Sequence, residues 1–128
     1  MNPFTKILVV EDDSTSSKLL TYHLRVMGYK NITEVKDGNL ALNQMHKEKP
    51  DLVIADWHMP NLNGLDLFKA IREVALWQDI LFLMVTVEKD HNKVQEAIQA
   101  GVRDYIVKPL NVENLKRKMD ELLSSTSD

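Results

Sequence analysis

The chain has 128 residues, a length that suits one domain. Its apolar content of 44% and charged content of 27% are those of an ordinary soluble globular protein. The formal net charge of −3 argues against nucleic acid as a partner, because nucleic-acid-binding domains usually carry a basic surface. With no cysteine, disulfides and thiolate metal sites are excluded. No signal-peptide core and no run of ~20 apolar residues for a membrane span occurs, so we expect a cytoplasmic protein.

Four short apolar runs, and a mixed stretch at 32–36, alternate with segments of helical periodicity along the chain. Apolar runs of about four to eight residues without a period of two indicate buried strands of a parallel sheet that is covered on both faces. We expect strands at 6–11, 32–36, 51–56, 81–86 and 104–108. This order predicts an α/β fold with a doubly wound, five-stranded parallel sheet and five helices, in one domain over residues 1–128.

Capping and turn residues mark the first two helices. Asp13 and Ser14 are good residues to begin a helix, and Gly28 is typical of a helix end. The Asp37–Gly38 turn opens the second helix. The residues expected to face the core are Leu20, Leu24 and Met27 in the first helix, and Ala41, Leu42 and Met45 in the second.

Apolar residues at helical spacing predict the last three helices. The third begins near Gly64 after a loop over 57–63, and the fourth runs from about 91 to Gly101. The fifth precedes a small polar tail at 124–128 that we expect to fray. The core-facing residues of these three helices are expected to be Leu65, Phe68, Ile71, Val94, Ala97, Ile98, Leu115, Met119, Leu122 and Leu123.

Four of the five strands stop at residues that handle metal or phosphate. These are Glu11 and Asp12 after the first strand, Asp56 after the third, Thr86 at the end of the fourth and Lys108 after the fifth. Ligands of parallel sheets bind outside the carboxyl ends of the strands, so these side chains should meet. Carboxylates suit Mg²⁺, while an ammonium and a hydroxyl suit a phosphoryl group. Asp56 is then the candidate nucleophile toward phosphorus.

Each of these residues also has an ordinary structural explanation. A lone Asp after a strand usually belongs to a turn or caps a helix, and an acidic residue such as Asp13 is expected to do so here. A threonine that ends a strand reflects β propensity, and a lysine before proline is commonly a solvated loop residue. The presence of all four signals at the ends of four strands, in this order, is what indicates a site for phosphate and metal.

Four stretches of the sequence resemble the receiver domains of two-component response regulators: LVVEDDS, DLVIADWHMPNLNGLDL, MVTVE and YIVKPL. The resemblance covers the whole chain, and Trp57 and the single-domain length are most similar to stand-alone chemotaxis regulators of the CheY type. It implies a flavodoxin-like fold with the strand order 2-1-3-4-5. It further implies a regulatory protein, not an enzyme, in which Asp56 accepts a phosphoryl group from a phosphohistidine on a sensor histidine kinase (CheA-like).

The resemblance also implies a Mg²⁺ site. Asp12 and Asp56 would bind the ion directly, together with the backbone carbonyl of His58, and Glu11 would act largely through water. In the family, the acidic pair follows the strand directly, which selects Glu11 and Asp12 and leaves Asp13 as the spare residue.

Further roles follow from the same resemblance. Lys108 would contact the phosphoryl oxygen, set by a cis bond to Pro109. Thr86 would move toward the phosphoryl group, and Tyr105 would swing inward behind it. These two residues form the expected switch, and the surface of the fourth helix, fifth strand and fifth helix would present the changed face to a partner.

Residues next to the site depart from the family pattern and are expected to tune the reaction. Val87 stands where Ala or Gly is usual, so its branched side chain is expected to crowd the phosphoryl pocket or to restrict Thr86. His58 stands where Asn is common, a position expected to influence attack by water. Glu88 belongs to the same tuning set. Leu110 replaces a usual Phe on the output face.

The implied output is contact with another protein by a monomer that binds neither nucleic acid nor membrane. The first candidate is a flagellar motor switch protein (FliM-like), with control of chemotaxis and flagellar motility, and another downstream protein remains open. A single-domain phosphorelay intermediate or phosphate sink is the alternative function. A degenerate receiver that works without phosphorylation also stays open. A small-substrate aspartyl-phosphate hydrolase would need Asp-x-Asp, and here the second acidic position is His58.

Overall fold

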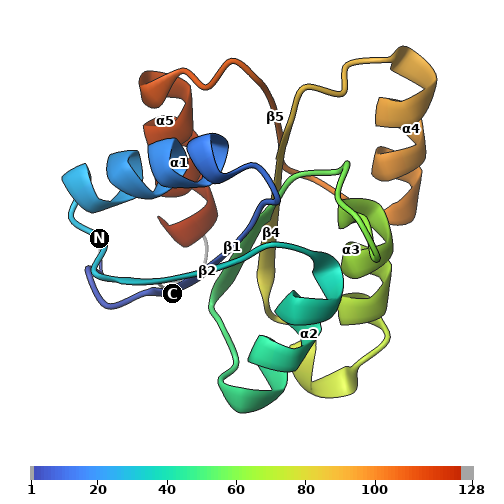
Figure 1. Cartoon of the computed structure of the whole chain (residues 1–128), viewed down its shortest axis with the longest axis horizontal. Coiled ribbons are helices and arrows are strands. Elements are labelled where there is room, and N and C mark those ends of the chain that lie inside the picture. Colours follow the sequence, from blue (N-terminus) through green and yellow to red (C-terminus); the bar gives the residue numbers. More distant parts are fainter. Residues whose placement is uncertain (1, 125–128) are drawn as a thin grey trace.

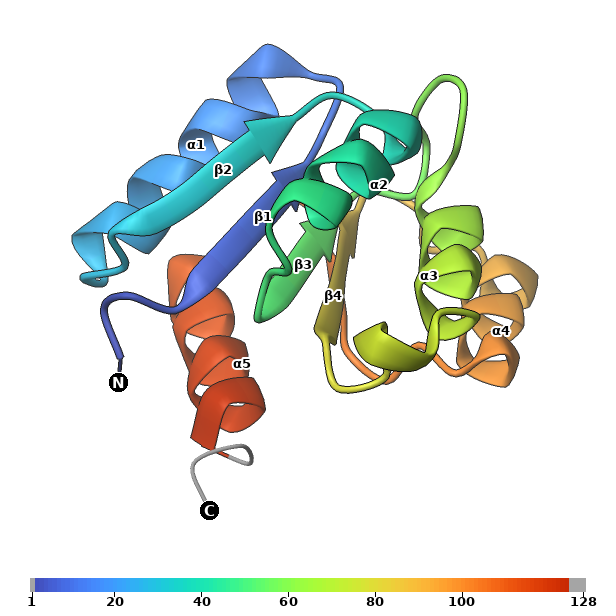
Figure 2. The same ribbon diagram turned by 90° about the horizontal axis from the view of Figure 1, so that it is seen from below.

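A parallel sheet separates two layers of helices (Figure 1). The computed structural model describes residues 2–124. The strands are β1 (Lys6–Val10), β2 (Asn31–Val35), β3 (Leu52–Ala55), β4 (Leu81–Thr86) and β5 (Tyr105–Val107). The helices are α1 (Ser14–Val26), α2 (Gly38–Lys47), α3 (Gly64–Arg72), α4 (His91–Ala100) and α5 (Val112–Ser124), with a short 3-10 helix, η1 (Ala75–Trp77). Helices α1 and α5 cover one face of the sheet, and α2, α3 and α4 cover the other (Figures 1 and 2).

All strand pairs are parallel, and the strand order is β2-β1-β3-β4-β5. The predicted doubly wound α/β fold and the order 2-1-3-4-5 are therefore confirmed. Because every strand runs in the same direction, the carboxyl ends of all five reach the same edge of the sheet (Figure 2). The chain then leaves this edge through the loops that precede each helix, which is where the candidate site lies.

The continuous apolar runs of the strands supply both halves of the core. In β1, Ile7 and Val9 pack with the layer of α1 and α5, while Leu8 and Val10 pack with the layer of α2, α3 and α4. All four side chains are at most 2% exposed. A strand buried on both faces has no need of polar alternation, which explains why the sequence shows apolar runs without a period of two.

Helix boundaries follow the predicted capping residues. The side chain of Asp13 accepts a hydrogen bond from the N–H of Ser16, and that of Asp37 accepts one from the N–H of Leu40. Gly28 has a left-handed backbone with φ of 107° after α1, as expected for a residue that ends a helix. These local signals therefore place the beginnings of the first two helices, and the end of the first, correctly.

The structure corrects the sequence-based prediction in two places. Ile98, expected in the core, is 52% exposed, and Ala97 is the buried residue of α4. The apolar spacing predicted the helix correctly. However, α4 buries only a narrow stripe that contains Ala97, so Ile98, the next residue, faces water. The 3-10 helix η1 was not predicted, although Trp77 within it is buried. Of the tail expected to fray, Ser124 ends α5 and residues 125–128 lie outside the described residues.

Within residues 2–124, none of the helices has the length and apolar character needed to cross a membrane.

The contrast between Ile98 and a buried isoleucine gives a stability test. Ile71 in α3 is fully buried. Ile71→Ala should lower the free energy of unfolding by about 2–5 kcal/mol, because it leaves a cavity. Ile98→Ala should change it by less than about 0.5 kcal/mol, as is usual for surface substitutions. Urea denaturation followed by circular dichroism measures both, and comparable losses would place Ile98 in the core after all.

Candidate functional site

The carboxyl ends of four strands bring the predicted polar residues to one place. Glu11 directly follows β1, Asp56 follows β3, Thr86 ends β4 and Lys108 follows β5. Backbone hydrogen bonds continue the strand pairing into this region. The N–H of Asp56 donates to the carbonyl of Val10 at 3.1 Å, and the N–H of Lys108 donates to the carbonyl of Thr86 at 2.8 Å. The sheet itself therefore positions the backbone of the functional residues.

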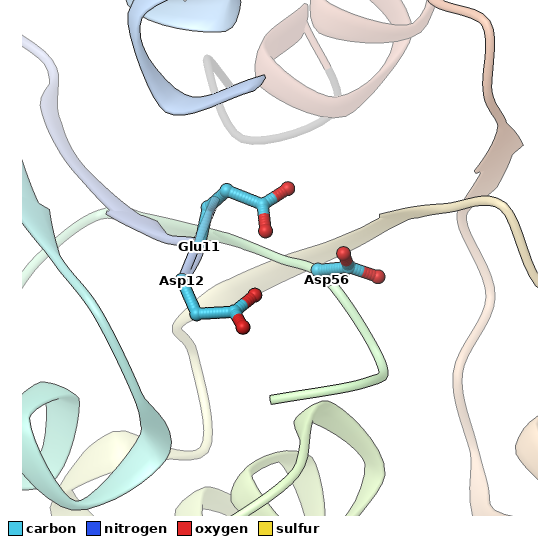
Figure 3. Close-up of side chains that lie close together, drawn as sticks. All are labelled: Glu11, Asp12 and Asp56. Carbon is cyan, nitrogen blue, oxygen red and sulfur yellow. The ribbon is translucent and has the colours of Figure 1, made fainter. Parts of the chain in front are cut away.

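Three carboxylates converge at this edge (Figure 3). One oxygen from each of Glu11, Asp12 and Asp56 lies within 4.8 Å of the other two. Glu11 is buried, Asp56 is half-buried and Asp12 is exposed, so the cluster opens toward solvent on the Asp12 side. Asp13 has another task, since its Oδ2 accepts a hydrogen bond from the N–H of Ser16 at 2.9 Å and caps α1. The geometry thus agrees with the choice of Glu11 and Asp12 over Asp13.

Lys108 faces the carboxylates. Its Nζ lies 2.5 Å from Oε1 of Glu11 and 3.4 Å from Oδ2 of Asp56. The peptide bond between Lys108 and Pro109 is cis, as the resemblance implied. Glu11 is therefore the nearer partner of the ammonium group in this conformation.

The electrostatics of the site reflect its partial burial. Burial raises the pKa of the Glu11 carboxyl, and this effect together with the negative charge of Asp56 outweighs the hydrogen bond from Lys108, which lowers it. Burial alone would lower the pKa of Lys108, but the hydrogen bond to Glu11 and the charge of Asp56 reverse this and raise it. Lys108 thus remains an ammonium at neutral pH. Three carboxylates against this one ammonium make an environment suited to a divalent cation.

The two expected switch residues lie on neighbouring strands. Thr86 is fully buried, and its hydroxyl accepts a hydrogen bond from the N–H of Glu88 at 3.2 Å. Tyr105 is half-buried, and its hydroxyl donates to the carbonyl of Glu88 at 2.6 Å. Burial and the charges of Glu88 and Asp56 raise the pKa of Tyr105 to about 12, so the phenol keeps its proton at neutral pH. Tyr105 already packs inward here, and its movement, like that of Thr86, stays a prediction.

The tuning residues lie on the loops that flank the site. Nε2 of His58 is 2.8 Å from Oε1 of Glu88, a contact that joins the loop after β3 to the loop after β4. This hydrogen bond lowers the pKa of Glu88. Val87 is 63% exposed, and its effect on the phosphoryl pocket or on Thr86 stays a prediction. The pairing of His58 with Glu88, which sequence alone did not indicate, joins two residues that are 30 positions apart.

A hollow of about 160 Å³ lies beside Asp56 and Lys108. Its apolar walls come from α1 and from the loop between β5 and α5, and they include Leu19, Pro109 and Leu110. Leu110 therefore borders the site and not only the output face to which the sequence assigned it.

The outward face of α1 is a feature that the sequence reasoning missed. Leu19, Tyr22 and Val26 are 47%, 62% and 68% exposed. Their spacing of three and four residues places them on one side of the helix, opposite the buried Leu20 and Leu24. The signal was present in the sequence as a second apolar set at helical spacing, beside the set that forms the core.

Comparison with known proteins identifies the family. The model of the response regulator receiver domain matches residues 7–120, and the chain belongs to this family. It is 38% identical to the chemotaxis protein CheY of Pseudomonas aeruginosa, over 91% of this chain and 94% of that protein. It is 40% identical to chemotaxis protein CheY-3 of Vibrio cholerae, over 95% of this chain and 94% of that protein. The chain is thus a receiver of two-component signalling, a class of regulatory proteins.

Solved structures give the same result. The signal receiver domain of a signal transduction histidine kinase from Syntrophus aciditrophicus matches with a TM-score of 0.89 at 28% identity, covering 96% of this chain and 92% of that chain. The receiver domain of a sensor histidine kinase from Pseudomonas aeruginosa matches with a TM-score of 0.85 at 26% identity, covering 94% of this chain and 98% of that chain. The latter structure has a magnesium ion coordinated in its active-site cleft.

Repulsion within the acidic cluster can be measured in metal-free protein. Asp12→Asn should raise Tm by roughly 2–4 °C at low salt, because it removes one of three like charges. Glu11→Gln should also raise Tm at neutral pH, because the raised pKa of Glu11 means that burial and the charge of Asp56 disfavour its ionised form in the folded protein. Thermal unfolding in EDTA checks both, and the gain in Asp12→Asn should shrink as salt is added. A lower Tm for Asp12→Asn would contradict net repulsion at the cluster.

Proposed function

We propose that this receiver is a phosphorylation-activated switch in which Asp56 accepts a phosphoryl group from a phosphohistidine on a sensor histidine kinase. The observation that carries the proposal is the meeting of Asp56 with Glu11, Asp12 and Lys108 at the carboxyl ends of the sheet. The whole chain serves as a single receiver domain, and it works in the cytoplasm as a monomer.

The donor set fits Mg²⁺, which takes one or two carboxylates with waters and phosphate oxygens. Asp12 and Asp56 would hold the ion together with the backbone carbonyl of His58, and Glu11 would hold it through water. When bound, Mg²⁺ neutralises charge on the oxygens of the phosphoryl group. The three carboxylates lie close enough to share one ion, which supports this assignment.

The chain's own residues position the transfer. A carboxylate oxygen of Asp56 attacks phosphorus while the nitrogen–phosphorus bond of the phosphohistidine breaks, and the imidazole leaves with the bonding electrons. The ammonium of Lys108, 3.4 Å from Oδ2 of Asp56, is placed to stabilise the negative charge of the phosphoryl oxygens. Attack by water on phosphorus later releases phosphate and restores the carboxylate. The protein thus assists its own phosphorylation and dephosphorylation without turning over an external substrate as an enzyme does.

The added charge resets contacts around the site. The phosphoryl group carries roughly −1.5 to −2 charge in place of the single negative charge of the Asp56 carboxylate, which draws Lys108 away from Glu11 and draws the Thr86 hydroxyl toward the new oxygens. Thr86 then gives up its contact with the N–H of Glu88, while Tyr105 is held by the carbonyl of the same residue. Glu88 lies in the loop between β4 and α4, so movement of this loop connects Asp56 with β5 and α4. The population of molecules then shifts toward the active state.

His58, Val87 and Glu88 tune the lifetime of the phosphoryl group. The contact between His58 and Glu88 joins the loops after β3 and β4, which flank Asp56, so both side chains are placed to influence water that approaches the phosphoryl group. Val87, which is largely exposed, lies next to Thr86.

The output is a contact with another protein. Exposed apolar residues lie on α4, β5 and the start of α5, namely Ile98, Val107 and Val112. The names of the relatives favour chemotaxis. As the target we propose a flagellar motor switch protein. A phosphorelay intermediate or phosphate sink would use the same chemistry at Asp56 and differ in the partner. Binding of the purified switch protein to phosphorylated and unphosphorylated forms separates these functions.

The exposed face of α1 suits the docking of the kinase. The phosphohistidine has to approach Asp56, and Leu19 lies both on this face and in the wall of the hollow beside Asp56. Tyr22 and Val26 extend the apolar surface away from the site along α1. A kinase domain that covers this surface would bury apolar area while its phosphohistidine reaches Asp56.

Phosphorylation should change the fluorescence of Trp57, which adjoins Asp56 and is 4% exposed. Acetyl phosphate with Mg²⁺ should produce the change together with a mass increase of one phosphoryl group. Asp56→Asn should abolish both. Asp13→Asn is the matched control and should respond as wild type, because asparagine also caps helices well. A wild-type protein without the mass increase would favour a degenerate receiver, and steady release of phosphate from many small esters would favour a hydrolase.

Docking on α1 can be tested by comparing phosphoryl transfer from the kinase with transfer from a small donor, acetyl phosphate. Tyr22→Ser and Val26→Ser should each lower the rate of transfer from the phosphorylated kinase by about tenfold, which corresponds to ~1.4 kcal/mol of lost contact energy. Their rates with acetyl phosphate should equal that of wild type. Leu76→Ser, at a site on η1 that is 79% exposed, is the matched control and should change neither rate. Equal kinase rates in all variants would exclude docking on α1.

A further inference from the structure

The loop between β3 and α3 is tied to a part of the chain far from it in sequence. Nδ2 of Asn61 donates a hydrogen bond to Oδ2 of Asp37 at 2.8 Å. Oδ1 of Asp37 accepts the N–H of Leu40 at 2.9 Å and so caps α2. Asp37 is only 7% exposed. Its two oxygens thus perform different tasks, one for its own helix and one for the loop.

Backbone contacts strengthen this attachment. The N–H of Gly38 donates to the carbonyl of Leu62 at 3.1 Å. A Cβ atom on Gly38 would lie 2.6 Å from that carbonyl oxygen, so the close approach requires glycine. Asn61 itself has a φ of 69°, a left-handed conformation that asparagine tolerates better than most residues. The bond to Asp37 compensates for the cost of this conformation.

The other end of the loop is closed separately. The N–H of Gly64 donates to the carbonyl of Trp57 at 2.8 Å. A Cβ atom on Gly64 would lie 2.1 Å from the carbonyl oxygen of Asp56, so α3 begins directly against the end of β3. His58 lies between these two attachments, and its backbone carbonyl is the proposed metal ligand.

We propose that Asp37 is a positioning residue for the metal site. Its Oδ2 holds Asn61, and through Asn61 it fixes the backbone of the loop that carries His58. This inference rests on the Mg²⁺ site of the proposed function. Two attachments on opposite sides of His58 leave its carbonyl little freedom, so the ligand is in place before the ion arrives and less ordering is needed on binding. Asp37 does not touch the ion, and it acts through the loop alone.

Two substitutions remove the attachment without removing the helix cap. Asp37→Ser keeps one oxygen for the N–H of Leu40, because serine caps helices well, but its shorter side chain has no second oxygen to accept the hydrogen bond from Asn61. Asn61→Gly keeps the left-handed backbone and loses the side-chain bond, but it also adds the backbone freedom of glycine, so the variant at position 37 is the more direct test. Asp90→Asn is the matched control. Asp90 caps α4 through the N–H groups of Asn92 and Lys93, so this variant alters a helix cap outside the loop.

The first measurement uses metal-free protein. Asp37→Ser and Asn61→Gly should speed amide hydrogen exchange in residues 58–62 relative to wild type, while Asp90→Asn should not. Unchanged exchange in the first two variants would overturn the inference. This result does not depend on Mg²⁺, so it tests the positioning of the loop even if the proposed function fails.

The second measurement is the Mg²⁺ affinity, read from the fluorescence of Trp57. The two loop variants should bind Mg²⁺ roughly two- to tenfold more weakly than wild type, the range expected for one hydrogen bond. Asp90→Asn should bind as wild type does. Wild-type affinity in both loop variants would overturn the inference by showing that Asp37 serves only to cap α2. Absence of binding in wild type would instead overturn the Mg²⁺ site itself.

Discussion

The repulsion among three carboxylates is the constraint on which the site depends. Glu11, Asp12 and Asp56 are held within 4.8 Å of one another because the parallel sheet brings the ends of β1 and β3 side by side. The ammonium of Lys108 offsets part of this charge from the end of β5. A site with this balance costs stability when empty and favours the arrival of positive charge. The fold maintains it because the surrounding core, formed by continuous apolar strands, fixes the backbone on which the carboxylates stand.

The sequence predicted the features that depend on local pattern. Apolar runs located four of the five strands, and the ends of these four runs located Glu11, Asp12, Asp56, Thr86 and Lys108. The prediction for Ile98 was wrong because helical spacing identifies a helix but not the width of the stripe that it buries. The strand order came from resemblance to a family, since apolar pattern alone does not determine which strands are neighbours.

The sequence did not predict the contacts between loops. His58 and Glu88 are 30 positions apart, and Asp37 and Asn61 are 24 apart. Neither pair has a periodic signal, because each depends on where the sheet brings two separate loops. Asp37 was predicted correctly as a turn residue that opens α2. Its second oxygen also accepts a hydrogen bond from Asn61, and no local pattern indicates this contact. A residue with one satisfied local role can therefore carry a second role that appears only in three dimensions.

These loop contacts connect the proposed metal site to the proposed switch. The loop that carries His58 is attached to Asp37 on one side and to Glu88 on the other. Glu88 in turn contacts both Thr86 and Tyr105 through its backbone. A change in charge at Asp56 that moves Thr86 must therefore alter the contacts of Glu88, and with them the hold on His58 and Tyr105. These contacts run from Asp37 through the loop of His58 to Glu88 and Tyr105, so the proposed switch has a continuous connection from the metal site to β5.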